Sequence, residues 1–216
     1  MDVTGIIFDL DGTLLNTLAD IAAAANHALK SANLPEHETA AFGAMVGDGM
    51  AKLAERALPE DLRTPGSVEA LKQSIYENLD RREHELTAPY PGIPELLEVL
   101  AQREVPIAVL SNKPHALTKA AVAHFFPEIP FDPVFGVSEA VPPKPNLNGA
   151  NEILSRWGGL PGAVVYVGDT NTDMITASNA GFFAVGVTWG FRQASELVRH
   201  GARALVDEPM QLLTLI

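Results

Sequence analysis

Two aspartates at the end of an apolar stretch near the N-terminus are the first residues whose types and spacing suit chemistry. Asp9 and Asp11 follow residues 4–8, whose β-branched and aromatic side chains predict a buried strand. Gly12 breaks that strand, so both carboxylates are expected where the backbone leaves the sheet. Neighbouring carboxylates repel each other unless a cation or a proton separates them, which indicates a Mg2+ site. One could then be a nucleophile and the other an acid and base, although an ordinary Asp-Gly turn is the alternative.

Four more polar residues follow the later apolar stretches. Ser111 and Asn112 come directly after a predicted strand, where they could bind the oxygens of an anion or cap the helix that follows. Asp169 follows another predicted strand, and Asp173 falls in the first turn of the next helix, where a carboxylate is favourable in itself. Because ligands bind at the carboxyl ends of parallel strands, we expect these side chains to gather at one edge of a sheet.

Lys144 lies in a stiff segment, 141–145, in which three of the five residues are prolines. A rigid backbone of this kind could aim one ammonium group at a fixed point. The alternative is an exposed loop lysine, since most lysines lie on protein surfaces.

The composition limits the classes of function. The 216 residues carry a formal net charge of −12, which argues against binding to nucleic acid or to an anionic membrane. An anionic small-molecule substrate would need a local positive site, which a divalent metal and one or two lysines could supply. The chain has no cysteine, which excludes disulfides, thiolate zinc sites and cysteine nucleophiles. It shows neither a signal-peptide pattern nor an apolar run of membrane-spanning length, so we expect a cytosolic location.

The order of the predicted elements indicates two kinds of structure. Residues 17–88 carry helical patterns and no strand pattern, whereas strands and helices alternate afterwards, as is typical of a parallel α/β sheet. We therefore expect a core domain at 1–16 and 89–216 and a helical cap domain at 17–88. The predicted helices are 19–32, 38–46, 49–58, 67–86, 94–102, 115–125, 148–157 and 173–180, and the predicted strands are 4–8, 106–110, 133–137, 163–167, 183–187 and 204–206.

Four segments, in this order, resemble the signature of the haloacid dehalogenase superfamily of phosphatases. They are Asp-Leu-Asp-Gly-Thr at 9–13, Ser111, Lys144 with Pro145, and Gly168-Asp169 with Asp173. The resemblance implies an α/β fold, with a Rossmann-like parallel-sheet core and an inserted all-helical C1 cap. A further similarity, to the phosphoglycolate phosphatase group, rests on residues 46–49, 90–92, 111–114 and 188–191.

The resemblance implies a Mg2+-dependent phosphomonoesterase that acts on a small phosphorylated metabolite, either phosphoglycolate or a sugar or polyol phosphate. Asp9 would attack phosphorus to give an aspartyl-phosphate, and Asp11 would serve as acid and base. Mg2+ would be held by the side chains of Asp9 and Asp169 and by the backbone carbonyl of Asp11, with Asp173 supporting the site. The phosphoryl oxygens would be bound by Thr13, Ser111, Asn112 and Lys144.

In the helical segment, Gly47-Asp48-Gly49 is the predicted contact for the substrate. Glycines on both sides of a polar residue let the backbone approach a small ligand closely, although an interhelical turn is the alternative. Asp48 stands where the phosphoglycolate phosphatase group usually carries asparagine, so its negative charge would repel a substrate carboxylate.

Three other functions remain open on the same scaffold. One is a phosphomutase of the β-phosphoglucomutase type, and another is a phosphonatase, for which Lys52 would form a Schiff base. The third is a non-catalytic binding module. The sequence predicts no oligomeric state.

Overall fold

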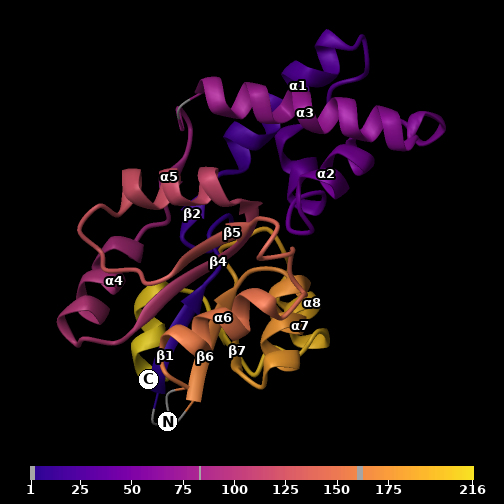
Figure 1. The fold of residues 1–216 in the computed structure, drawn as a ribbon. Coiled ribbons are helices and arrows are strands. Elements are labelled where there is room, and N and C mark those ends of the chain that lie inside the picture. The colour runs from indigo at the N-terminus through magenta and orange to yellow at the C-terminus, as the bar shows by residue number, and fades with distance from the viewer. Residues whose placement is uncertain (1–2, 83, 160–162) are drawn as a thin grey trace. The chain divides into compact units, whose positions relative to one another are not determined.

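The computed structural model describes residues 3–82, 84–159 and 163–216 (Figure 1). The chain forms two compact units. We call Met1–Leu15 together with Pro89–Ile216 the core unit, and Asn16–Ala88 the helical unit. None of the described helices combines the length and the apolar character that a membrane span requires.

The core unit is built on a parallel sheet of six strands in the order β5-β4-β1-β6-β7-β8. Strand β1 is central, and Phe8 near its end pairs with Val109 of β4 on one side and with Val167 of β6 on the other. The residues that follow these three strands therefore emerge together at one edge of the sheet. The strands are β1 (Val3–Phe8), β4 (Ile107–Pro114), β5 (Val134–Val137), β6 (Ala163–Gly168), β7 (Phe183–Val187) and β8 (Ala204–Val206).

Helices cover both faces of this sheet, as successive residues of β1 show. Ile6 and Phe8 share an apolar cluster with α4 and α5, whereas Ile7 and the buried Tyr166 share another with α6, α7 and α8. Side chains of a strand alternate between faces, so a continuous apolar strand is expected where both faces are covered. The helices are α4 (Ile93–Gln102), α5 (His115–Phe125), α6 (Asn148–Arg156), α7 (Asn171–Ala180) and α8 (Ala194–Arg199), with the 3-10 helix η3 (Pro209–Thr214) after β8.

Strand β4 is longer than its sequence predicts. It runs four residues past the expected end at 110, and Pro114 pairs with Val137 of β5 after a shift in register. Ser111 and Asn112 therefore belong to the strand. The alternative that they cap the next helix is wrong, because Pro114 occupies the cap position of α5 and no side chain caps it.

The helical unit contains only helices among its regular elements within 17–82 and 84–87. Helices α1 and α3 pack along each other, and several of the buried residues of α1 are small, such as Ala22 and Ala25. The elements are α1 (Leu18–Ser31), η1 (Thr39–Ala44), α2 (Met50–Ala57), η2 (Glu60–Leu62) and α3 (Pro65–Arg82). The predicted helix at 38–46 is thus a shorter 3-10 helix. Glu83, inside the predicted helix 67–86, lies outside the described residues.

A two-stranded pairing that the sequence analysis did not predict joins the segments that connect the units. It consists of β2 (Leu15–Asn16) and β3 (Ala88–Pro89). Strands of two residues leave no periodic pattern for a sequence-based prediction to detect.

Candidate active site

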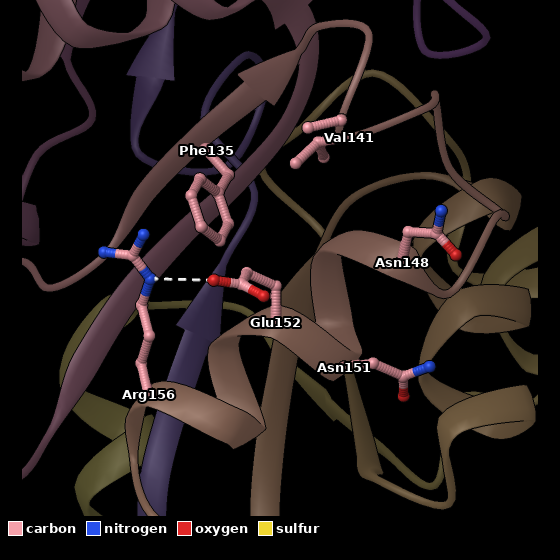
Figure 2. A pocket seen from close by; sticks show the side chains of 7 residues that line it. Phe135, Val141, Asn148, Asn151, Glu152 and Arg156 are labelled. Carbon is pink, nitrogen blue, oxygen red and sulfur yellow. Dashed lines mark hydrogen bonds and ion pairs between the residues drawn. The ribbon is translucent and has the colours of Figure 1, made fainter.

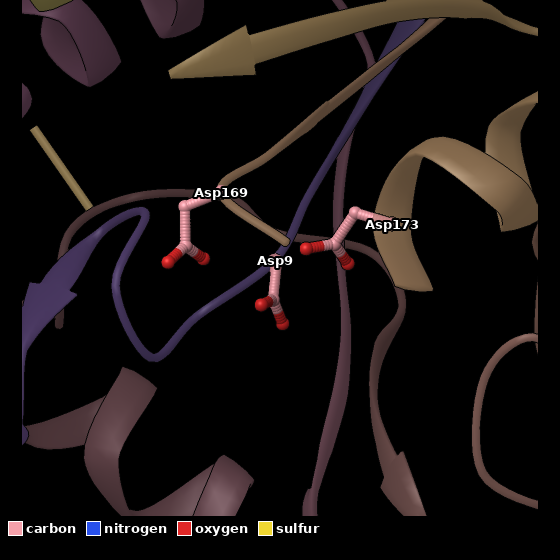
Figure 3. A group of neighbouring side chains, drawn as sticks. All are labelled: Asp9, Asp169 and Asp173. Atoms are coloured by element: carbon pink, nitrogen blue, oxygen red, sulfur yellow. The ribbon is translucent and has the colours of Figure 1, made fainter. Parts of the chain in front are cut away.

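Three buried aspartates converge at the carboxyl edge of the sheet. Asp9 follows β1, Asp169 follows β6 and Asp173 stands in the first turn of α7 (Figure 3). One carboxylate oxygen of each lies within 4.8 Å of those of the other two. The parallel pairing of β1 with β6 accounts for the approach of Asp9 to Asp169. The cluster thereby unites Asp9 with Asp173, which lies 164 positions further along the chain.

Asp173 is fixed by the start of its own helix. Thr170 precedes α7, and its hydroxyl donates to Asp173 Oδ2 at 2.6 Å while accepting from the Asp173 backbone N–H at 3.3 Å. The Thr170 backbone N–H also donates to Asp173 Oδ2, at 3.0 Å. This reciprocal capping leaves Oδ1 to face the other side chains of the site.

Lys144 joins the aspartates through its ammonium group. Its Nζ donates to Asp173 Oδ1 at 2.6 Å and lies 2.8 Å from Asp9 Oδ1. Burial alone would lower the pKa of Lys144, but the charges of Asp173 and Asp9 outweigh it and hold this pKa well above its usual range. The lysine is therefore held as a cation between two carboxylates.

Asn112 holds the backbone of Lys144. Its amide oxygen accepts from the Lys144 backbone N–H at 2.7 Å, and its amide nitrogen donates to the Lys144 carbonyl at 3.3 Å. The predicted role of Asn112 was to bind phosphoryl oxygens. In the structure both ends of its side-chain amide contact the Lys144 backbone, and its phosphate-binding role stays a prediction.

The acidic cluster carries more negative than positive charge. Burial and the charge of Asp173 raise the pKa of Asp9 to about 7 against the opposing effect of Lys144. Burial, Asp173 and Asp9 likewise raise the pKa of Asp169 well above its usual range. Asp9 Oδ1 is buried and has no hydrogen-bond partner among the described residues, so its contact with Lys144 is one of charge. A hard divalent cation with oxygen ligands would fit this donor set and relieve the repulsion.

Asp169 is oriented by contacts to both of its carboxylate oxygens. Thr13 Oγ1 donates to Oδ1 at 3.2 Å, and the backbone N–H of Phe191 donates to Oδ2 at 2.8 Å. Gly12 and Gly190 leave the room for this carboxylate, because a Cβ at either position would lie 2.2–2.3 Å from an Asp169 atom. Gly12 also has a φ of +89°, which favours glycine. The predicted phosphate ligand Thr13 is thus also a support for Asp169.

Asp11 lies outside the three-aspartate cluster and pairs with Lys113. The Lys113 ammonium donates to Asp11 Oδ1 at 3.1 Å and is 3.4 Å from Oδ2. The Ser111 hydroxyl, a predicted phosphate ligand, accepts from the Lys113 backbone N–H at 3.2 Å. Sequence reasoning did not single out Lys113 as functional. Its position directly after Ser111 and Asn112 was the available signal.

Comparison with known proteins assigns this chain to a family. A model of the family described as haloacid dehalogenase-like hydrolase matches residues 6–187, a span that includes every aspartate named above. The chain belongs to this family. The expected superfamily and the Rossmann-like parallel core are therefore confirmed, and the protein is a hydrolase by family.

Several relatives of this haloacid dehalogenase-like chain are similar over nearly its full length. A phosphoglycolate phosphatase of Haemophilus influenzae (strain 86-028NP) is 30% identical over 97% of this chain and 96% of its own. A solved structure from Lactobacillus delbrueckii subsp. bulgaricus has a TM-score of 0.93 at 29% identity, covering 100% of this chain and 99% of the other. The structure of a predicted phosphoglycolate phosphatase from Haemophilus somnus 129pt has a TM-score of 0.90 at 26% identity, covering 100% and 98%.

The predicted substrate contact of the helical unit has a partner of its own. Gly47 and Gly49 have φ values of +113° and +87°, and Gly49 directly precedes α2. Asp48 Oδ2 lies 2.5 Å from Arg56 Nη2, so its negative charge has a cationic partner within the helical unit. That this charge would repel a substrate carboxylate stays a prediction. Lys52, the Schiff-base candidate, is 58% exposed and pairs with Glu55 at 2.6 Å.

A separate hollow of about 500 Å³ lies against α6 in the core unit (Figure 2). Phe135 and Val141 line one side, and Arg156, paired with Glu152 at 3.2 Å, lines another. Its lining residues include none of the aspartates or lysines described above.

Proposed function

We propose that the protein is a Mg2+-dependent phosphomonoesterase that hydrolyses a small phosphorylated metabolite, either phosphoglycolate or a sugar or polyol phosphate. The observation that carries the proposal is the setting of Asp9. Its buried Oδ1 lacks a hydrogen-bond partner among the described residues and stands beside Lys144 in an acidic cluster suited to a cation. The phosphoglycolate phosphatases that resemble this chain at about 30% identity support the substrate class.

The proposed reaction has two steps. In the first, a carboxylate oxygen of Asp9 attacks phosphorus, the bond from phosphorus to the ester oxygen breaks, and Asp11 gives its proton to the departing alcohol. In the second, Asp11 takes a proton from water as the water oxygen attacks phosphorus. Asp9 then leaves as a carboxylate and inorganic phosphate is released.

The side chains of Asp9 and Asp169 and the backbone carbonyl of Asp11 would hold the metal, with Asp173 in support. Mg2+, when bound, supplies positive charge that offsets the charge of the transferring phosphoryl group. Asp173 is suited to support because Thr170 and Lys144 already occupy its oxygens. Because only the backbone carbonyl of Asp11 would bind the metal, the Asp11 carboxyl group stays able to carry a proton.

Positive and polar groups of the chain would position the phosphoryl group. Lys144 presents an ammonium beside Asp9, and Thr13 and Ser111 bring hydroxyls from the neighbouring strand ends. Asn112 would act through Lys144, whose backbone it holds. Preorganised groups of this kind stabilise charge that develops in the transition state. We assign the helical unit, as the predicted cap, the task of discriminating between leaving groups.

Phosphate release from a panel of phosphorylated metabolites, with and without Mg2+, tests this function. We expect turnover of at least one small ester that stops on chelation and returns with Mg2+, whereas Ca2+ supports it poorly because it prefers more and longer ligand contacts. Free phosphate should appear in proportion to the substrate consumed, since a mutase would instead yield an isomeric sugar phosphate. Full activity after exhaustive chelation would overturn the proposal. Lys52 gives no support to a phosphonatase, because its ammonium is exposed and paired with Glu55.

A further inference from the structure

The two lysines near the aspartates differ in how far their charges are compensated. Lys144 Nζ meets two carboxylates, at 2.8 Å from Asp9 and 2.6 Å from Asp173. Lys113 Nζ meets one carboxylate, that of Asp11, and its side chain is 10% exposed. Lys144 shows that a lysine in this setting can hold two carboxylates at once. Lys113, which holds one carboxylate, can therefore bind a second carboxylate.

The number of N–H donors on the ammonium group also indicates that Lys113 can bind a second carboxylate. A lysine ammonium has three N–H donors. The Asp11 oxygens lie 3.1 Å and 3.4 Å from Lys113 Nζ, so a single carboxylate engages it, with one contact short and the other long. A further N–H remains for another anionic oxygen without loss of the contact to Asp11.

Both the backbone and the ammonium group of Lys113 are held by hydrogen bonds, the ammonium by Asp11 Oδ1 at 3.1 Å. The Lys113 N–H donates to Ser111 Oγ at 3.2 Å, and the Lys113 carbonyl accepts from Thr118 Oγ1 at 3.2 Å. The extension of β4 to Pro114, paired with Val137 of β5, carries this residue along the sheet. Because the ammonium is already held at Asp11, less side-chain entropy is lost when it binds a further anion.

Asp11 links Lys113 to the leaving group of the proposed reaction. A residue that gives its proton to the leaving oxygen must come within a hydrogen-bond length of that oxygen, about 2.6–3.2 Å. Lys113 Nζ is a similar distance from Asp11 Oδ1, at 3.1 Å. A carboxylate attached to the carbon next to the leaving oxygen would fall within reach of Lys113.

We infer that Lys113 is a specificity-determining residue that binds the carboxylate of the leaving group. The inference rests on the proposed function and deepens it. It selects phosphate esters of 2-hydroxy carboxylates, such as phosphoglycolate, over neutral sugar or polyol phosphates. Lys113 supplies the local positive charge that such a substrate needs on a chain with a net charge of −12.

The test compares Lys113→Met with Lys113→Arg and with Lys119→Met. Lys119 is an exposed residue of α5, so its substitution removes the same charge away from the site. Phosphoglycolate is compared with 2-hydroxyethyl phosphate, in which a neutral hydroxymethyl group replaces the carboxylate. Melting temperatures verify that each variant folds.

We expect Lys113→Met to lower the ratio of kcat/KM for phosphoglycolate to that for 2-hydroxyethyl phosphate by about 10- to 150-fold, as expected for a lost charged hydrogen bond. Lys113→Arg should restore much of the ratio because it keeps the charge, and Lys119→Met should leave it unchanged. An equal loss with both substrates would mean that Lys113 acts only on Asp11 and would overturn the inference. An unchanged ratio would overturn it as well.

Binding measurements keep this test separate from that of the proposed function. 3-Phosphonopropionate, which carries a carboxylate and cannot be hydrolysed, is compared by calorimetry with propylphosphonate, which lacks the carboxylate. We expect the wild-type protein with Mg2+ to prefer the former by about tenfold or more, and Lys113→Met to lose the preference. The absence of any turnover would refute the phosphatase proposal, whereas equal binding of the two phosphonates by the wild type would refute the role of Lys113.

Discussion

The core unit and the helical unit differ in how they hold their charged side chains. Lys144 of the core unit is 2% exposed at its side chain and lies between two buried carboxylates, whereas Lys52 of the helical unit is 58% exposed and pairs with Glu55. Buried charges interact strongly and are costly to leave unpaired, whereas exposed pairs contribute little. The same kind of substitution should therefore change activity or stability more at a buried charge of the core unit than at an exposed charge of the helical unit.

Asp9→Asn should give the largest effect, because it removes the proposed nucleophile and a metal-ligand charge together. We expect kcat/KM to fall by well over the roughly 100- to 10,000-fold that is typical of losing an acid or base alone. The measurement is phosphate release under Mg2+ saturation, with Asp80→Asn as the matched control. Asp80 is exposed on α3, so this control should match the wild type. Residual activity of Asp9→Asn within tenfold of the wild type would contradict the nucleophile assignment.

Lys144→Met addresses the contrast in stability directly. Without its ammonium, Asp9 and Asp173 would be two buried carboxylates with no cation between them. We expect a loss of roughly 3–5 kcal/mol in the free energy of unfolding, measured with urea in the absence of metal. Added Mg2+ should recover part of this loss, since it supplies positive charge to the same cluster.

Lys52→Met is the control for this substitution in the helical unit. Its pair with Glu55 is exposed to solvent, so losing it should leave the free energy of unfolding close to that of the wild type. If the two variants lost equal stability, the proposed contrast between the units would be wrong.

Asp20 is a buried carboxylate inside the helical unit, so it separates the effect of burial from the effect of the unit in which a charge lies. Its Oδ2 accepts from Thr87 Oγ1 at 2.6 Å and from the Leu86 backbone N–H at 3.0 Å, and Arg82 Nε lies 3.2 Å from its Oδ1. Burial alone would raise the pKa of Asp20, but these hydrogen bonds and the charge of Arg82 lower it. The folded state therefore favours the ionised form.

We expect Asp20→Asn to cost about 1.5–3 kcal/mol in the free energy of unfolding at pH 7, the range for hydrogen bonds to a charged group. Because the pKa is lowered on folding, this stabilisation is present above about pH 4, the pKa of a free aspartate, and is lost as the pH falls through the lower value of the folded state. Urea unfolding of both proteins at pH 7 and below pH 3 measures this. A difference that persisted unchanged at low pH would argue against the role of the charge.

The sequence was informative where a catalytic residue type directly follows an apolar strand. Asp9 and Asp169 could be located at one edge of the sheet because each ends a run of buried residues, and parallel strands bring such ends together. Asp173 was predictable as a first-turn carboxylate, although its capping by Thr170 was not part of the prediction. These inferences require only the periodicity of the chain and the geometry of parallel sheets.

The sequence did not predict the contacts that depend on the exact residue at which a strand or helix ends. Strand β4 continues to Pro114, and only this extension explains how Lys113 reaches Asp11, 102 residues away in the chain. The same extension lets Asn112 hold the backbone of Lys144 instead of capping a helix. Propensity does not fix a strand end to within three residues, so neither pairing could be predicted.

Asp48→Asn should have the smallest effect on substrate preference. It tests the segment of the helical unit that the sequence predicts to contact the substrate. The sequence suggested that the Asp48 charge would repel a substrate carboxylate. Arg56 Nη2 lies 2.5 Å from Asp48 Oδ2, and Arg56 Nη1 donates to the Met45 carbonyl at 2.9 Å, so the charge is compensated inside the unit. We expect the ratio of kcat/KM for phosphoglycolate to that for 2-hydroxyethyl phosphate to change by no more than about fivefold.

Arg56→Met is the informative partner of Asp48→Asn, because it removes the guanidinium that lies 2.5 Å from the Asp48 carboxylate. If residues 47–49 meet the substrate, Arg56→Met should lower the efficiency for phosphoglycolate selectively, and the double variant Asp48→Asn with Arg56→Met should restore it. Rescue of this kind is specific to charge, since a variant that merely disturbed the fold would lower kcat/KM for both substrates together. A shift of more than tenfold in Asp48→Asn alone would mean that Arg56 does not compensate the charge where the substrate binds.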